Sequence, residues 1–335
     1  MVFNKGLLSQ AAVICAALSL PVCLFSAGSG RNPDRLLQAA RIALQSGDFA
    51  QADELYTSAI PDLEAAGPAD VRLAPSLVEL GAARAAEGRC QQAVDLIVRG
   101  IHLLDAAPQS GASQRSEAWE ELAKAYHCQR QYSKAEQALS RALDIEHNAP
   151  SPRPDRLVEL LAGQGMVYQS ERKFAQAETV FRSAQSVLDR SPRVNPLEAA
   201  LLLNNHGLLL RLTGRTAESE ATFRRGLALV ESAATPDPGM EASLLDNLAS
   251  LDLARKQYHD AAVFFSNALR LIDRGTSLPP RTAAQILHDY ALCLRKLGDR
   301  DQAKSLDTRA AALQSSQPDG DPSLVVDVAE LSRHQ

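Results

Sequence analysis

The sequence predicts an all-α protein built as a solenoid of about seven helix-turn-helix repeats. Three observations predict it: an Ala- and Leu-rich composition with only 4% aromatic residues, a repeat of 42 residues, and the positions of the prolines. Ala and Leu favour helices, whereas aromatic and β-branched residues favour strands. The formal net charge of −5, from 35 Lys+Arg and 40 Asp+Glu, argues against a nucleic-acid-binding protein, which needs a concentrated basic surface.

The N-terminal residues 1–28 have the pattern of a signal peptide. Lys5 is followed by an apolar stretch from Ala11 to Phe25 and then by the small residues Ser26, Ala27 and Gly28. One positive charge, an apolar stretch and a small-residue exit are the three parts of a secretory signal. We therefore expect cleavage near residues 26–29 and a protein exported to the periplasm or cell envelope, where disulfides persist.

Two other interpretations of this segment stay open. One is an uncleaved membrane anchor, although Pro21 and the shortness of the apolar stretch weigh against a spanning helix of about 20 residues. The other is lipid attachment at Cys23, which the preceding Leu20-Pro21-Val22 disfavours because such sites have a small residue just before the Cys.

Small residues recur at three positions of every repeat, and 20 of these 21 residues are Ala or Gly. Small residues at matched positions let two antiparallel helices approach closely. In the first helix they are Ala40, Gly81, Ala123, Gly165, Gly207, Ala249 and Ala291. In the second helix they are Ala52, Ala93, Ala135, Ala177, Ser219, Ala261 and Ala303, followed seven residues later by Ala59, Gly100, Ala142, Ala184, Gly226, Ala268 and Ala310.

Larger apolar residues keep the same spacing, with Leu or Trp119 near the start of each first helix. The seven 25-residue windows that start there contain none of the 17 prolines, which avoid helix interiors. The prolines, Pro61 among them, are expected to mark connections between helices. Gly47, Gly88, Gly214 and Gly298 are expected to end first helices.

These features define seven units and a tail. The predicted units are residues 34–66, 75–107, 117–148, 158–190, 200–233, 242–274 and 284–313, and the linker and tail are 314–335. Arg300 and Asp307 replace apolar residues in the last unit, as an end cap requires. The apolar tail segment 324–331 fits helical or strand spacing equally well, and we expect it to dock on the last repeat or in the groove.

The repeat resembles the tetratricopeptide repeat (TPR) family. The pattern Leu36…Ala40…Gly47-Asp48-Phe49…Ala52…Tyr56…Ala59 is a close match to its helix-turn-helix signature. The 42-residue period, with Leu203-Asn204-Asn205 and Leu245-Asp246-Asn247, resembles the repeats of kinesin light chains and related bacterial proteins. A bacterial source also agrees with 28 Arg against 7 Lys. The resemblance implies a right-handed superhelical solenoid whose first helices line a concave groove that binds other proteins.

No catalytic or cofactor motif stands out, so we expect no enzyme, no cofactor and no metal site. The His residues lack the three-to-five spacing of a zinc site. His206 is expected to be a core histidine, and the adjacent His127 and Cys128 point to different helix faces, which disfavours a catalytic couple.

Three Cys remain after cleavage, and two of them lie at the same edge of neighbouring units. Cys90 begins the second helix of unit two and Cys128 ends the first helix of unit three. A disulfide between them is one hypothesis, and two buried reduced thiols are the alternative. Cys293 is five repeats away and should be free.

The function expected from these features is that of a non-enzymatic protein-interaction scaffold. A protein or peptide partner would bind in the groove, and the membrane would be contacted only through an uncleaved N-terminal segment. The alternative is a sensory or regulatory module that binds a small ligand or a glycan strand. Nine residues next to the packing positions of the first helices are predicted to face the groove: Glu120, Lys124, His127, Gln169, Asn204, Arg211, Asp246, His288 and Arg295.

Overall fold

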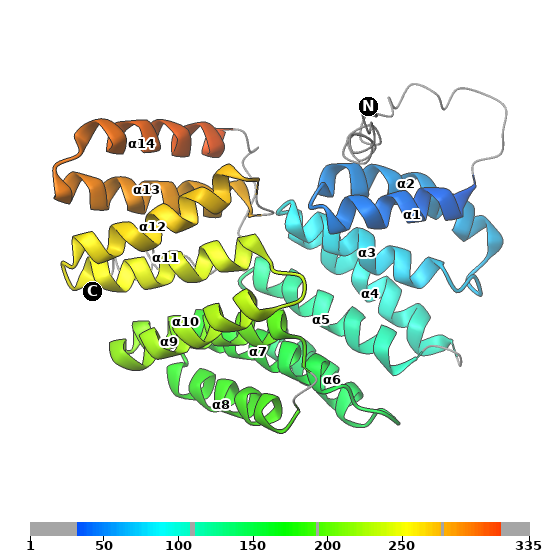
Figure 1. The fold of residues 1–335 in the computed structure, drawn as a ribbon. Coiled ribbons are helices and arrows are strands. Elements are labelled where there is room, and N and C mark those ends of the chain that lie inside the picture. Colours follow the sequence, from blue (N-terminus) through cyan, green and yellow to red (C-terminus); the bar gives the residue numbers. More distant parts are fainter. Residues whose placement is uncertain (1–31, 108–110, 192–193, 276–277, 316–335) are drawn as a thin grey trace, which may run out of the picture. The chain divides into compact units, whose positions relative to one another are not determined.

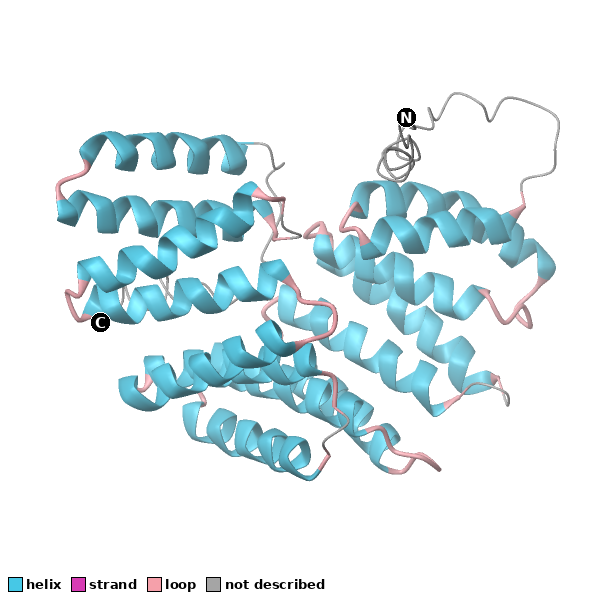
Figure 2. Ribbon diagram, in the orientation of Figure 1, coloured by secondary structure: helices cyan, strands magenta, loops and turns pink. Residues whose placement is uncertain are grey.

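The computed structural model describes residues 32–107, 111–191, 194–275 and 278–315, and within these ranges the chain is helical with no strand (Figures 1 and 2). The first helices of the repeats are α1 (Pro33–Gln45), α3 (Leu73–Ala86), α5 (Ala112–Cys128), α7 (Pro154–Ser170), α9 (Pro196–Leu212), α11 (Pro238–Ala254) and α13 (Pro280–Leu297). The second helices are α2 (Phe49–Ala66), α4 (Cys90–Ala106), α6 (Tyr132–His147), α8 (Phe174–Arg190), α10 (Thr216–Ser232), α12 (Tyr258–Asp273) and α14 (Arg300–Ser315). The predicted signal segment and the 324–331 tail lie outside the described residues.

Each first helix packs against the second helix of its own pair, and each second helix packs against the first helix of the next pair. The fold prediction, an all-α solenoid of about seven repeats, is therefore confirmed. None of the described helices is long and apolar enough to cross a bilayer.

The small residues lie where two helices touch. A Cβ atom added to Gly207 would lie 2.4 Å from a ring carbon of Phe223, and one added to Gly165 would lie 2.5 Å from Phe181. Ser219, the one exception to the Ala/Gly pattern, is fully buried, and its hydroxyl donates to the carbonyl of Gly207 at 2.8 Å. A serine fits there because a buried hydroxyl with a partner carries little penalty.

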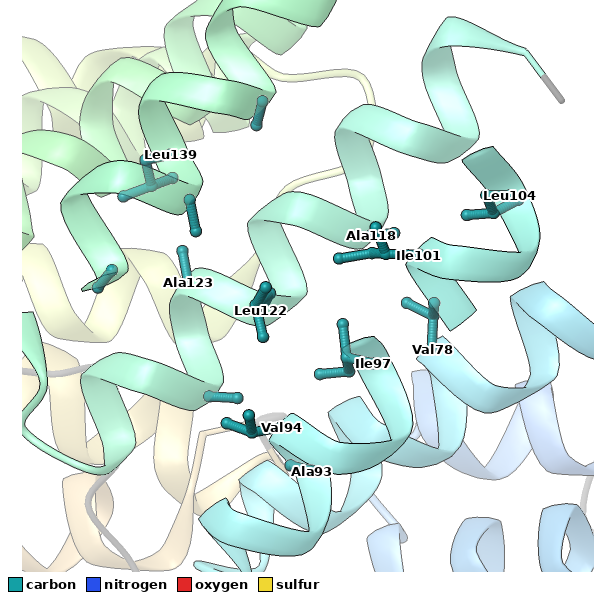
Figure 3. Close-up of a cluster of buried hydrophobic side chains, with 14 of the residues drawn as sticks. Val78, Ala93, Val94, Ile97, Ile101, Leu104, Ala118, Leu122, Ala123 and Leu139 are labelled. Carbon is teal, nitrogen blue, oxygen red and sulfur yellow. The ribbon is translucent and has the colours of Figure 1, made fainter. Parts of the chain in front are cut away.

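Buried apolar residues pack in clusters within and between successive helix pairs. In Figure 3, Val78 of α3 and Ile97 and Ile101 of α4 face Ala118 and Leu122 of α5. Burial of such aliphatic side chains stabilises the fold by roughly 1.5–3 kcal/mol each. Val78 is 7% exposed, so this residue belongs to the core.

Four first helices begin at a proline, so these prolines lie in the first turn of a helix and not only in the connections between helices. Helices α7, α9, α11 and α13 start at Pro154, Pro196, Pro238 and Pro280, where the missing N–H would have had no helical partner.

Pro61 departs from the expectation that prolines lie in connections, because it lies inside α2. Pro61 and Thr57, one turn earlier, are both exposed. Water can therefore reach the Thr57 carbonyl, which lacks its helical partner.

The turn inside each repeat needs a residue with positive φ. Gly47, Gly88, Gly214 and Gly298 supply it in four repeats, with φ between 76° and 92°. In the other three repeats Arg130, Arg172 and Lys256 adopt φ of 57°, 59° and 63°. The geometry is thus common to all seven repeats, and three of them hold a side chain in a conformation that favours glycine.

Candidate binding site on the first helices

The nine predicted residues occupy three positions of the repeat. Most lie three residues before or four residues after the small residue of a first helix, and Lys124 lies one residue after it. Positions seven residues apart share one face of a helix. Their side chains nevertheless differ widely in exposure and in partners.

The α5–α7 contact contains a network of ion pairs, called the closed network below because each of its carboxylates meets a cation. Nε and Nη2 of the buried Arg156 still have no hydrogen-bond partner among the described residues. Glu120 is only 7% exposed and pairs with Lys124 at 2.9 Å and with Arg156 of α7. Arg156 also pairs with Glu159 at 2.5 Å. Burial acts to raise the pKa of Glu120, but the positive charges of Lys124 and Arg156 outweigh it and the pKa falls. The prediction that Glu120 faces an open groove is wrong, because Arg156 at the start of α7 covers it.

Lys124 belongs to the same network. Its ammonium also contacts Glu121 at 2.8 Å. Burial acts to lower the pKa of Lys124, but the charges of Glu121 and Glu120 raise it above its usual value. Lys124 is therefore positively charged at neutral pH and held in place by two carboxylates.

His127 and Gln169 are also held within the helix packing. The Nε2 atom of His127 lies 2.9 Å from the Ser170 hydroxyl, and the ring packs against Tyr132. Burial lowers the pKa of His127, so the ring is neutral at pH 7. Gln169 is 2% exposed, which contradicts its prediction as a groove residue, because it lies within the packed end of α7.

Asparagines link α9 to its neighbours on both sides. The Nδ2 atom of Asn247 donates to Oδ1 of Asn204 at 2.8 Å. Asn205 approaches the sulfur of Met166 at 3.1 Å. Asn204 still has two N–H donors, and Asn247 still has a carbonyl oxygen as acceptor.

Arg211 of α9 and Asp246 of α11 differ from the α5–α7 network in the carboxylate, because Asp246 has an oxygen without a hydrogen-bond partner whereas Glu120 is paired. Within the described part of the chain, the buried Nε of Arg211 and the buried Oδ1 of Asp246 have no hydrogen-bond partner. Burial raises the pKa of Asp246 to about 8, with a further contribution from the charge of Asp289 on α13. Burial also lowers the pKa of Arg211, against the attraction of the two aspartates. The first helices of repeats five and six thus hold an unused donor and an unused acceptor.

His288 and Arg295 contact their own second helix. Arg295 pairs with Asp307 of α14 at 2.6 Å, and His288 lies 3.4 Å from the same carboxylate. Asp307 stands where earlier repeats have Phe223 and Phe265. These two predicted groove residues therefore engage the polar side chain of the last repeat.

Cys90 and Cys128 are joined by a disulfide, with their Cα atoms 5.8 Å apart. The bond ties the start of α4 to the end of α5, across the boundary between repeats two and three. Cys293 is a buried free thiol, and its Sγ lies 3.2 Å from the carbonyl oxygen of Tyr258.

Three residues of this face were not predicted: Arg156, Asn247 and Asp289. The doublets Asn204-Asn205 and Asp246-Asn247 were a usable signal, since polar pairs interrupt otherwise apolar helices. No group of three or more His, Cys, Asp or Glu in the described ranges is arranged to hold a metal ion. His206 is half-buried, stacks on Phe181 and bonds to Glu178 at 3.1 Å.

Known structures with the same architecture are TPR proteins. A TPR protein from Parabacteroides merdae shares 16% identity at a TM-score of 0.54, over 84% of this chain and 93% of that chain. The chain has the TPR fold. BtubC (BKLC) from P. vanneervenii matches with 17% identity and a TM-score of 0.57, over 71% of this chain and 96% of its own length. This likeness agrees with the predicted TPR resemblance.

A third similar structure is a Rap protein in complex with competence and sporulation factor. It shares 14% identity at a TM-score of 0.57, over 84% of this chain and 74% of that chain. At identities this low the likeness to these TPR structures is one of fold. No family model and no curated protein sequence matches the chain.

Proposed function

We propose that the protein is a non-enzymatic scaffold that binds an extended peptide segment of a partner protein on the first helices of repeats five and six. The observation that carries the proposal is the unused pair of buried atoms, Nε of Arg211 and Oδ1 of Asp246. A buried donor or acceptor without a partner costs roughly 1–3 kcal/mol. A ligand that supplies both partners recovers this free energy on binding.

A peptide backbone has the required chemistry, since each amide offers a carbonyl to Arg211 and an N–H to Asp246. Asn204 and Asn247 extend the same face with further donors and acceptors. The Rap protein of similar fold is seen in complex with competence and sporulation factor, which supports a proteinaceous partner for this chain.

The test is co-purification of the tagged full chain from the cells that produce it, with mass spectrometry of the bound material. We expect one stoichiometric protein partner with the wild type. Its recovery should fall at least tenfold with the double variant Arg211→Gln/Asp246→Asn, because each lost contact is worth about 1–3 kcal/mol. The matched control is Arg300→Gln/Asp301→Asn on α14, which removes the same charges from exposed positions.

Equal recovery with both double variants would place the binding site elsewhere. A bound small molecule or glycan in native mass spectra, without a protein partner, would favour a sensory or regulatory module instead.

We also propose that the protein is exported to the periplasm or cell envelope. The Cys90–Cys128 disulfide supports this location, because such bonds persist in oxidising compartments. The charge, apolar stretch and small-residue exit of residues 1–28 support it independently. Cell fractionation with N-terminal sequencing tests the proposal, and a cytosolic chain that still begins at Met1 would contradict it.

A further inference from the structure

A cleft of about 490 Å³ lies between the second helices α8 and α10. Arg182, Asp189 and Arg190 of α8 and Arg225 of α10 line it, together with Leu203 and His206 of α9. The volume is within the range of small-molecule sites, roughly 300–1,000 Å³. Leu203 and His206 lie on a different face of α9 from Asn204 and Arg211, by helical spacing.

The lining of this cleft is positively charged although the protein as a whole is acidic. Three arginines and one aspartate give the lining a formal charge of +2, against −5 for the whole chain. Arg182 and Arg225 remain about half to two-thirds exposed. Their guanidinium groups are thus accessible to a ligand from solvent.

Acidic side chains hold the arginines in position. Glu178 accepts from Arg182 at 2.8 Å and from His206 at 3.1 Å. Asp189 accepts from Arg225 at 3.2 Å and from Gln185 at 2.8 Å. Each guanidinium has five N–H donors, so one such contact orients the group and leaves other donors for a ligand.

From this geometry we propose that the α8–α10 cleft binds the phosphate group of a small soluble organic phosphate. A phosphomonoester carries about −1.5 to −2 charges at pH 7, opposite in sign to the lining. Arginine presents paired N–H donors that fit phosphate oxygens bidentately. Leu203, at the floor of the cleft, is 2% exposed, so the arginines carry the recognition and the organic part of the ligand is directed toward solvent. The site is separate from the proposed peptide site and does not depend on it.

The experiment is isothermal titration of the purified full chain with two probes, inorganic phosphate and inorganic pyrophosphate. Ionic strength is kept constant with sodium chloride so that general screening does not change. We expect saturable binding of both probes by the wild type and at least a tenfold loss of affinity in Arg182→Gln/Arg225→Gln. The matched control is Arg224→Gln, which removes a charge from α10 outside this cleft, where Arg224 pairs with Glu220 at 3.0 Å.

Circular dichroism melting shows whether each variant is folded, and the exposure of the substituted arginines predicts that it is. Absence of saturable phosphate binding by the wild type would overturn the proposal, as would an equal loss with Arg224→Gln. Vesicles that contain phosphatidic acid form a separate arm of the test. Binding to those vesicles without binding of the free probes would also overturn the proposal, since the phosphate source would then be a lipid.

Discussion

Repeats three and four and repeats five to seven place the same positions of the first helices in very different environments. Glu120 in repeat three and Asp246 in repeat six stand at equivalent positions, 126 residues apart. Glu120 is paired with Lys124 and Arg156, whereas Oδ1 of Asp246 has no partner among the described residues. The difference lies in the repeat that follows. Arg156 in repeat four corresponds to Thr282 in repeat seven, and threonine cannot neutralise an acid.

This comparison shows that the small and apolar packing residues determine the backbone fold. The residues next to them determine whether a buried polar group finds a partner within the protein. A closed network such as that of Glu120 joins two helices. An open pair such as Arg211 and Asp246 keeps the cost of buried polar atoms without a partner, which a ligand that supplies the partners removes. Four predictions test this contrast, and the expected effects on stability become smaller from one to the next.

The largest expected effect comes from removing the disulfide next to the closed network. The bond connects residues 38 apart in sequence. Closing a loop of that length contributes about 4 kcal/mol through the entropy of the unfolded chain. Cys90→Ser/Cys128→Ser should lower the free energy of unfolding, measured in urea, by about that amount. As a control, a reducing agent should destabilise the wild type and leave the double variant unchanged.

The next effect concerns the closed network itself. Glu120→Gln leaves the buried guanidinium of Arg156 without one of its carboxylates, which should cost about 3 kcal/mol. Glu117→Gln, on the same helix, is the control. It weakens a loose surface contact of 3.9 Å to Arg153, and a glutamine oxygen can still accept the hydrogen bond that Glu117 receives from Ser113 at 2.6 Å. The substitution should therefore cost less than about 0.5 kcal/mol. Similar costs for both variants in thermal and urea unfolding would mean that the network is not stabilising.

The open pair predicts a pH dependence. The pKa of Asp246 is about 8 in the folded chain and about 4 when unfolded. The folded state therefore binds the extra proton, and its stabilising effect is lost as the pH rises toward and through 8. Unfolding should require about 2.7 kcal/mol less at pH 9 than at pH 6. The groups that face Asp246 are Arg211 of α9 and Asp289 of α13.

Two variants isolate this effect. Asp246→Asn should remove most of the pH dependence, whereas Asp273→Asn, an exposed partner of Arg309 on the surface, should not. Thr282→Arg should supply the missing cation and lower the pKa of Asp246. The free energy of unfolding should then no longer fall above pH 6. If Asp246→Asn and Thr282→Arg both kept the wild-type pH profile, the assignment to Asp246 would be incorrect.

The smallest effect comes from the turns, where adjacent repeats differ in one residue. Gly214 and Lys256 have φ of 76° and 63°. Lys256→Gly should stabilise by about 1 kcal/mol because it relieves the left-handed backbone. Gly214→Lys should destabilise by a similar amount, since an added Cβ meets no atom within 4 Å and only the backbone changes. Melting temperatures that move in the same direction for both variants would contradict this explanation.

The fold could be predicted because its determinants are local and recur. Gly165 and Gly207 must be small to admit Phe181 and Phe223, and such requirements repeat every 42 residues. The chemistry of the first-helix face was harder to predict, because the side chains there depend on single residues of another helix, in the next repeat or in their own. Glu120 is buried only because Arg156 lies across from it. His288 and Arg295 have the predicted spacing but contact Asp307, which stands in the last unit where every earlier unit has an apolar residue.

The disulfide between repeats two and three also has a mechanical consequence. Because each repeat contacts chiefly its neighbours, tension applied to the two ends should open a solenoid one repeat at a time. Each repeat of about 42 residues would then become an extended segment about 150 Å long. The segment between Cys90 and Cys128, 38 residues apart in sequence, cannot be stretched while the disulfide is intact. The fully stretched chain is therefore about 130 Å shorter than without the bond. Formation of the Cys90–Cys128 disulfide therefore reduces the maximum length of the protein under tension.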